Sequence, residues 1–231
     1  MLEKEFLDFG YTKEDYILIK NSHGITGYTD ETLLKKIKEI TKFLLKLDYS
    51  KEEVIKMTKS LPTIYGLSIE NMKQKIEDMV SLGYSKEEVI KMTKSLPQIY
   101  GYSIENMKQK IEDIVSLGYS KEEVIKMTKN LPTIYGLSIE NIKQKVNFYD
   151  SIEMHQLAVV DSKQLMQSVT LSYARYQFYL SIGIIVDMDN YKKMFIGNKI
   201  FEKQYGIGKT ELLMLYNYEQ FMEERENDRT I

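Results

Sequence analysis

Apolar residues recur along this chain at the spacing of amphipathic helices. After Ser85, residues Val89, Met92 and Leu96 follow one another at helical intervals, and Pro97 then blocks simple continuation of that helix. A second apolar stripe, with members at i, i+3, i+7, i+10 and i+11, consists of Ile104, Met107, Ile111, Ile114 and Val115. No segment alternates with the period of two that a half-buried strand requires. The pattern therefore predicts two helices joined by the connector LPQIYG.

Polar residues mark the ends of these two helices. Ser85 and Glu88 form a capping-box pattern, in which the serine hydroxyl accepts a backbone N–H and the glutamate reaches back to the cap. Ser103 stands at the start of the second helix. Gly101 is expected to adopt a left-handed conformation in the connector, because glycine does so without steric strain.

The helix–connector–helix unit repeats with a period of 35 residues. Residues 47–81 and 82–116 are identical at 31 of 35 positions, and residues 82–116 and 117–151 are identical at 26 of 35. Such a period is typical of stacked repeats, in which each unit buries its apolar face against its neighbours. We therefore predict an all-α solenoid of helix–turn–helix repeats, with either a right-handed or a left-handed superhelix.

Both ends of the chain carry degenerate copies of this unit. Residues 1–46 are predicted to form an N-terminal capping repeat, since FGYTKEDYILIK echoes LGYSKEEVIKMTK. Residues 47–151 hold the three near-identical repeats, and residues 152–222 hold degenerate C-terminal repeats in which the spacing shortens to 30. The charged tail, residues 223–231, is expected to fray. The whole chain is predicted to form one continuous solenoid domain.

The overall charge narrows the function classes only slightly. The chain has 32 basic and 34 acidic residues, so any attraction to nucleic acid must come from local segregation of charge. The absence of cysteine excludes disulfides, thiolate metal sites and a cysteine nucleophile. No signal, transit or transmembrane segment is visible, and we expect a cytoplasmic protein.

Lysine stands at equal offsets in the three full repeats. The first helices carry two such rows: Lys56, Lys91, Lys126 and Lys59, Lys94, Lys129. Equal offsets become neighbours about 8–10 Å apart in a stack of helices, so each row is suited to follow a phosphate backbone. The second row ends the helices, where a cation suits the helix dipole, and no acidic residue stands three or four positions away. That row supplies the best candidates for phosphate contacts.

A further row runs through the second helices. Arg175 stands in register with Lys145 at the offset of 30 and is expected to extend this row of nucleic-acid contacts. The third repeat has lost acidic residues, so the field should be more positive around residues 120–150. The alternative is that the lysines belong to a solvated face, because pairs such as Glu52 and Lys56 at i, i+4 merely stabilise a helix.

Only a few positions vary between the near-identical repeats. Thr63, Gln98 and Thr133 stand directly after the connector proline and are candidate specificity positions. Neutral drift explains the same changes. Two tyrosine rows are expected to pack between repeats with their hydroxyls in water, although one row could instead stack on bases: Tyr49, Tyr84, Tyr119 and Tyr65, Tyr100, Tyr135.

No catalytic or metal-binding constellation is present. His23 and His155 are the only histidines, and neither has a carboxylate at metal-ligand spacing. The segment GIGKT resembles the end of a phosphate-binding loop. That loop requires glycine at position 203, where this chain has lysine, so a turn with Gly206 at positive φ is expected instead. We predict that the chain is not an enzyme and needs no cofactor, metal or small-molecule substrate.

The repeat unit resembles that of the mitochondrial transcription termination factor (mTERF) family. The shared features are a leucine–glycine start, a capped first helix, a proline before a short apolar turn, and a serine that opens a second helix. They are carried by Leu82, Gly83, Ser85, Val89, Met92, Leu96, Pro97, Ile99, Ser103, Met107, Ile111 and Leu117. The resemblance extends over roughly residues 9–216.

This resemblance implies a left-handed superhelix whose concave, positively charged groove binds double-stranded DNA or, in some members, RNA. It therefore favours a nucleic-acid-binding protein that grips the DNA backbone and regulates transcription or replication. Two departures from the family are the near-zero net charge and the absence of a transit peptide. The alternative is a protein-binding solenoid, an inhibitor or adaptor, whose concave face grips a partner protein.

Overall fold

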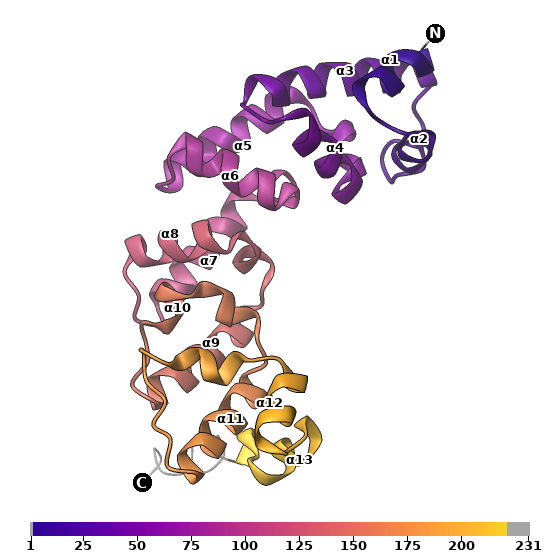
Figure 1. Cartoon of the computed structure of the whole chain (residues 1–231). Coiled ribbons are helices and arrows are strands. Elements are labelled where there is room, and N and C mark those ends of the chain that lie inside the picture. The colour runs from indigo at the N-terminus through magenta and orange to yellow at the C-terminus, as the bar shows by residue number, and fades with distance from the viewer. Residues whose placement is uncertain (1, 221–231) are drawn as a thin grey trace. The chain divides into compact units, whose positions relative to one another are not determined.

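The fold is built from helices throughout residues 2–220, which are the residues that the computed structural model describes. These residues form thirteen α-helices and five 3-10 helices and contain no strand, which confirms the predicted all-α repeat class (Figure 1). The predicted fraying of residues 223–231 lies outside the described residues. The chain divides into two compact units, Met1–Lys110 and Ile111–Ile231. A single continuous domain and the handedness of the superhelix stay predictions.

The first unit contains the N-terminal repeat and most of the first two full repeats. Its elements are α1 (Leu2–Phe9), α2 (Lys13–Lys20), α3 (Asp30–Lys46), α4 (Lys51–Ser60), η1 (Pro62–Gly66), α5 (Ile69–Leu82), α6 (Lys86–Ser95) and η2 (Pro97–Gly101). The division between the units falls inside α7 (Ile104–Val115).

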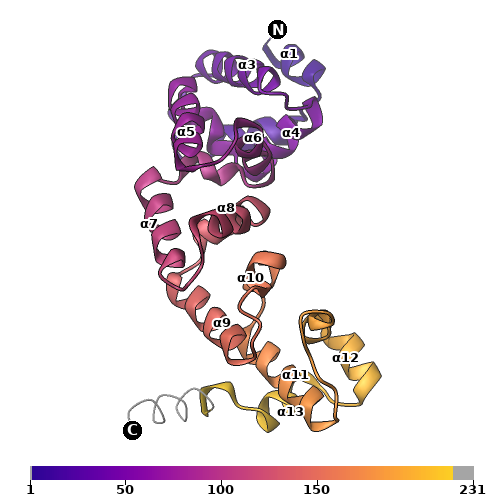
Figure 2. The same ribbon diagram turned by 90° about the vertical axis from the view of Figure 1, so that its left-hand side faces the viewer.

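The second unit contains the third full repeat and the degenerate C-terminal repeats. Its elements are α8 (Lys121–Asn130), η3 (Pro132–Gly136), α9 (Ile139–Ser151), α10 (Leu157–Val160), η4 (Ser162–Met166), α11 (Val169–Ser181), η5 (Tyr191–Phe195), α12 (Asn198–Tyr205) and α13 (Lys209–Leu215). The first helix of the fourth repeat is reduced to α10, which lies beside α8 (Figure 2).

The first helices α2, α4, α6 and α8 begin at a capping box, whereas α10 has no side-chain cap. In the second repeat, Ser85 Oγ accepts the backbone N–H of Glu88 at 3.2 Å, and Glu88 Oε2 accepts the backbone N–H of Ser85 at 2.9 Å. The same reciprocal pair opens α4 and α8, and Thr12 with Asp15 forms it in the N-terminal repeat. These contacts satisfy backbone donors that a helix start leaves without partners.

The connectors form short 3-10 helices, each with proline in its first turn. Gly101 ends one of them without a positive φ, so its expected left-handed conformation was wrong. The positive φ values belong instead to Gly83 at +121° and Gly118 at +103°, which follow the second helices. The connector turn ends in extended backbone at Tyr102, and that geometry does not require glycine.

Buried hydroxyl groups join successive repeats in the first unit. Tyr11 donates to or accepts from Thr58 at 3.0 Å, and the Thr58 and Tyr65 hydroxyls are 2.7 Å apart. One repeat later, the Tyr49 and Thr93 hydroxyls are 2.5 Å apart. Each set combines a tyrosine of one repeat with the first-helix threonine of the next, so it fixes both the spacing and the rotation of neighbouring repeats.

The shortened spacing of the second unit leaves the second helices in register. Ser138 caps α9 and Ser168 caps α11, and both helices have 13 residues, as the offset of 30 predicts. The junction between the third and fourth repeats differs from the earlier ones. There the Tyr119 hydroxyl donates to the backbone carbonyl of His155 at 2.9 Å, and the two rings stack with their centroids 4.1 Å apart.

Candidate nucleic-acid interface

The row Lys56, Lys91 and Lys126 lies on the exposed side of the first helices. The core side of α4 is formed by Val54, Met57 and Thr58, and congruent residues form it in α6 and α8. Lys56, Lys91 and Lys126 are all exposed. Within residues 2–220 none of the three has a hydrogen-bond or ion-pair partner, so their ammonium groups are available to a ligand.

Lys59 and Lys94 instead form ion pairs with the preceding repeat. Lys59 Nζ lies 3.4 Å from Asp15 Oδ1, and Lys94 Nζ lies 2.8 Å from Glu53 Oε2. The acidic partner is in both cases the third residue of the preceding first helix, which also belongs to its capping box. Neither lysine has an acidic residue three or four positions away in its own helix, and the carboxylate comes from the repeat stacked before it.

Further contacts hold Lys94 in this position. Its ammonium donates to the backbone carbonyl of Asp48 at 2.7 Å and lies 5.1 Å from the centroid of the Tyr49 ring. The hydrogen bond from Lys94, together with the capping N–H of Ser50, lowers the pKa of the Glu53 carboxyl. A phosphate that bound Lys94 would therefore have to displace a carboxylate. Lys129, at the congruent position, is half-buried.

The row that contains Lys145 and Arg175 points into the protein. Lys145 is 5% exposed and Arg175 is 3% exposed. The Arg175 guanidinium donates to the carbonyls of Met194 at 3.0 Å and Ile196 at 2.5 Å and to Asn198 Oδ1 at 2.8 Å. Arg175 is expected from the sequence to extend a row of phosphate contacts, but the structure places its side chain inside the protein.

The congruent lysine of the first full repeat explains this inward direction. The Lys75 ammonium donates to the carbonyl of Tyr102, the residue that follows η2. Ile196, a partner of Arg175, follows η5 in the same way. Carbonyl groups at the end of a helical turn carry partial negative charge, so a cation from the preceding second helix stabilises them. Lys75 and Arg175 therefore each hold the next repeat's connector in place.

The candidate specificity positions lie in the 3-10 connectors and are half-buried. Gln98 Nε2 donates to the carbonyl of Ser60 at 3.5 Å, and the Thr133 hydroxyl lies 3.6 Å from Met166 Sδ. These contacts reach neighbouring repeats. A role of Thr63, Gln98 and Thr133 in sequence recognition stays a prediction.

Five of the six tyrosines in the two rows are part of the core. Tyr49, Tyr84 and Tyr119 are at most 3% exposed, and Tyr65 is fully buried. The prediction that the tyrosine hydroxyls lie in water was wrong for Tyr49 and Tyr65, whose hydroxyls bind other hydroxyls inside the first unit. Burial also raises the pKa of Tyr65 well above its ordinary value. A buried ring cannot stack on a base, so base stacking is not supported for the five buried tyrosines of these rows, whereas Tyr135 is half-buried.

The histidines and the segment GIGKT, considered above for metal binding or catalysis, lie within residues 2–220. No group of three or more His, Cys, Asp or Glu side chains that could hold a metal ion occurs in those residues. His155 Nδ1 lies 2.5 Å from Asp150 Oδ1, but the ring is stacked on Tyr119 and serves the junction described above. Gly206 has φ +73° and α13 begins at Lys209, which confirms the turn expected for GIGKT. No helix in the same residues is long and apolar enough to cross a membrane.

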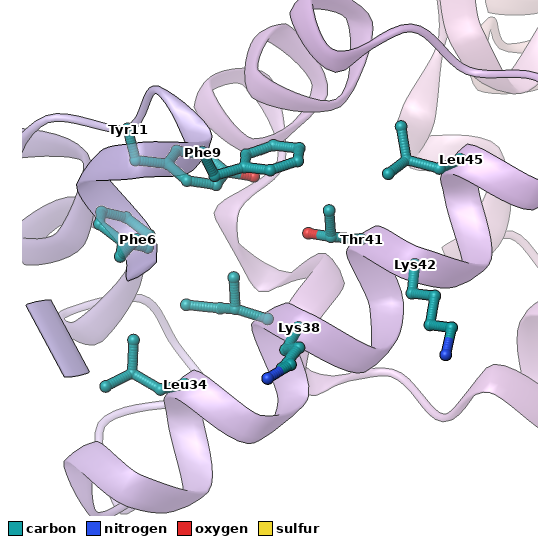
Figure 3. A pocket seen from close by; sticks show the side chains of 9 residues that line it. Phe6, Phe9, Tyr11, Leu34, Lys38, Thr41, Lys42 and Leu45 are labelled. Atoms are coloured by element: carbon teal, nitrogen blue, oxygen red, sulfur yellow. The ribbon is translucent and has the colours of Figure 1, made fainter. Parts of the chain in front are cut away.

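An apolar pocket of about 400 Å³ lies between α1 and α3. Phe6, Phe9 and Tyr11 face Thr41 and Leu45 across it (Figure 3). Its exposed lining is mostly apolar, and Lys38 and Lys42 also border it. None of the lysines of the exposed row Lys56, Lys91 and Lys126 lines this pocket.

Comparison with known protein families identifies the family of this chain. The model of the mTERF family matches residues 6–162, which include the N-terminal repeat, the three near-identical repeats and α10. A search of curated proteins found no match.

Proposed function

The chain belongs to the mTERF family of nucleic-acid-binding helical-repeat proteins, and from that premise we propose that it is a non-enzymatic protein that grips the backbone of double-stranded DNA. The observation that carries this proposal is the exposed row Lys56, Lys91 and Lys126, whose ammonium groups have no partner in the described residues. Lys56 and Lys91 stand at congruent positions on α4 and α6 of the first unit, and that arrangement suits the regular spacing of phosphates.

The ion-paired lysines Lys59 and Lys94 are proposed to add weaker phosphate contacts beside the Lys56 row. Lys56 and Lys59 are three residues apart on the exposed side of α4, so a phosphate near Lys56 also attracts Lys59. Lys59 and Lys94 can exchange a carboxylate for a phosphate, but that exchange gains less than binding by a free lysine. We therefore assign the strongest contacts to the Lys56 row and weaker contacts to Lys59, Lys94 and Lys129.

Binding is proposed to be tolerant of sequence. Arginine is the usual reader of guanine in the major groove, and this chain has only three. Arg175 is buried, and Arg225 and Arg229 lie outside the described residues. A backbone-gripping protein of this kind would act in transcription or replication by occluding or bending the duplex. A cytoplasmic location stays a prediction.

A salt titration tests the proposal. Labelled duplex DNA, single-stranded DNA and RNA are titrated at 50 and 200 mM salt, and each phosphate contact should steepen the logarithmic salt slope by about 0.9. If all six first-helix lysines bind phosphates, wild-type affinity should fall about 2,000-fold over this range. Replacing Lys56, Lys91 and Lys126 by glutamine should reduce that loss to about 40-fold.

A matched variant separates this face from general charge. Lys51, Lys86 and Lys121 occupy the first turns of the same three helices, so their replacement by glutamine removes the same charge from a different position. This control should keep most of the wild-type slope.

Because the net charge is −2 and Glu52 stands one turn from Lys56, a protein partner is the second candidate. Duplex binding that is absent at 50 mM salt, or insensitive to salt, would favour that partner.

A further inference from the structure

An open polar pocket of about 570 Å³ lies in the second unit, where the starts of α9 and α11 meet. Its lining offers hydroxyl, amide and ammonium groups from Ser138, Asn141, Gln144, Lys145, Gln167 and Ser168. One carboxylate, that of Glu140, also lines it and is exposed. The pocket is thus rich in hydrogen-bond donors and contains a single opposing charge.

Lys145 is a buried cation without a counter-charge. It is 5% exposed, and its ammonium donates to Asn141 Oδ1. Within residues 2–220 no carboxylate forms an ion pair with it. An ammonium has three donors, so this one contact leaves the group incompletely satisfied. Burial alone lowers the pKa of Lys145, with no neighbouring acid acting in the opposite direction.

The congruent lysine of the first full repeat is compensated. Burial also lowers the pKa of Lys75, but Asp78 and Glu105 both oppose that shift. Asp78 stands three residues after Lys75, and Glu105 lies in the first turn of the next second helix. The ammonium of Lys75 further binds the carbonyl of Tyr102. Lys75 thus has a carbonyl partner and two carboxylates that act on its charge, whereas Lys145 has neither carboxylate.

Sequence changes in the third and fourth repeats remove both acids. The residue three positions after Lys145 is Phe148, which is fully buried. The residue congruent with Glu105 in the next second helix is Thr170, because α11 follows α9 at the offset of 30. Without these carboxylates the positive charge of Lys145 is unopposed, and an anion supplied from outside would compensate it.

Two helix starts add directed donors to this pocket. Ser138 Oγ accepts the backbone N–H of Asn141 at 3.2 Å, and Ser168 Oγ accepts that of Leu171 at 3.3 Å. The N–H groups of the first two residues of each helix have no partner inside the helix. Helix starts of this kind bind phosphate oxygens through those N–H groups and through the helix dipole.

We propose that this pocket binds a phosphate group, with Lys145 supplying the charge and the first turns of α9 and α11 supplying N–H donors. A phosphate fits because its several oxygens can accept hydrogen bonds from both helices and from the Asn141 and Gln144 amides at once. Glu140 weakens the site by repulsion. The proposal does not depend on duplex binding, since a phosphate alone is sufficient to test it.

The experiment is a titration of the full chain with inorganic phosphate at constant ionic strength, followed by the amide NMR signals of residues 139–141 and 169–171. Saturable shifts at both helix starts, absent with chloride, are expected. Lys145→Met and Thr170→Glu should each weaken binding by about tenfold or more. Glu140→Gln should strengthen it, and Lys143→Gln, which changes an exposed lysine on the same helix, should leave it unchanged.

A thermal melt guards against misfolding of the variants. Without phosphate, Lys145→Met should be at least as stable as the wild type, because it removes an uncompensated buried charge. Added phosphate should raise the Tm of the wild type and not that of Lys145→Met. The melt therefore distinguishes a lost ligand from a lost fold.

A second titration with an unphosphorylated DNA duplex identifies the source of the phosphate group. Shifts with inorganic phosphate indicate a free or terminal phosphate, and shifts with the duplex alone indicate a backbone phosphodiester. Either result supports the site. The absence of saturable shifts with both ligands, or equal shifts in Thr170→Glu, would overturn it even if the duplex binds through the Lys56 row.

Discussion

Replacing Thr93 by valine should weaken the junction between the first two full repeats. The Thr93 hydroxyl lies 2.5 Å from that of Tyr49 and also donates to the carbonyl of Val89 at 3.0 Å. Valine keeps the shape of the side chain and removes the hydroxyl. Tyr49 is 3% exposed, and its remaining contact is the Tyr100 hydroxyl at 3.5 Å, which is a weak hydrogen bond. The orphaned tyrosine hydroxyl should lower the free energy of unfolding by about 1–3 kcal/mol.

Tyr49→Phe is the matched control because it deletes the other half of the same contact. Thr93 then keeps its bonds to the Val89 and Ile90 carbonyls, so no strong donor is stranded. This change should lower the unfolding free energy by only about 0.5–1.5 kcal/mol. The double variant should be more stable than Thr93→Val alone, since phenylalanine removes the group that valine orphans. Burial raises the pKa of Tyr49, so its hydroxyl stays protonated in neutral buffers.

Urea unfolding followed by far-UV circular dichroism measures these three variants. The midpoint should move while the slope m stays constant, because a change in m would indicate that the repeats unfold separately. Hydrogen exchange of α6 amides provides a local measurement at the same junction. The reasoning is refuted if Thr93→Val is no more destabilising than Tyr49→Phe, or if the two losses simply add.

The other predictions concern backbone strain, acid stability and the buried guanidinium. Gly118→Ala should lower stability by about 1–2 kcal/mol because φ is +103°, whereas Gly101→Ala, at an ordinary φ with open space, should not; thermal melts compare them. The pKa of Glu53 is lowered, so its contribution with Lys94 is complete above the unfolded value and is lost as the pH falls below 4.5. Glu53→Gln should flatten that acid loss in urea midpoints measured across this range. Arg175→Met should destabilise the second unit by about 3 kcal/mol in calorimetry, and an unchanged transition would contradict its role.

The helices were predictable because their signals are local. A capping box needs only residues three apart, so Ser85 and Glu88 identify the start of α6 without knowledge of its neighbours. The partner of Lys94 was not predictable in this way. Glu53 belongs to another repeat, and only the stacking of α4 against α6 brings its carboxylate to 2.8 Å from the ammonium. Congruent offsets predict which residues form rows, but they do not reveal ion pairs such as that between Lys94 and Glu53.

The inward direction of the Lys145 row has a sequence signal in its helical phase. In α9 the buried residues Ile142, Lys145, Val146 and Tyr149 follow one another at i, i+3, i+4 and i+7, so the lysine lies within the apolar stripe. In α4 the buried residues are Val54, Met57 and Thr58, and Lys56 lies off that stripe. The repeat period shows which residues are neighbours, and only the helical phase shows which way they face.

Helical phase also decides which differences between repeats matter for binding. A lysine on the exposed side is solvated whatever its neighbours are, so losing a nearby acid changes its field only slightly. A lysine on the apolar stripe has left water and needs an oxygen partner. Arg175 obtains three oxygens from the next repeat, and Lys75 has a carbonyl and two nearby acids. At Lys145 the two positions that hold acids around Lys75 are occupied by Phe148 and Thr170, neither of which carries a charge. These changes look like modest drift along the sequence, but they leave a buried cation whose charge only an external anion can fully compensate.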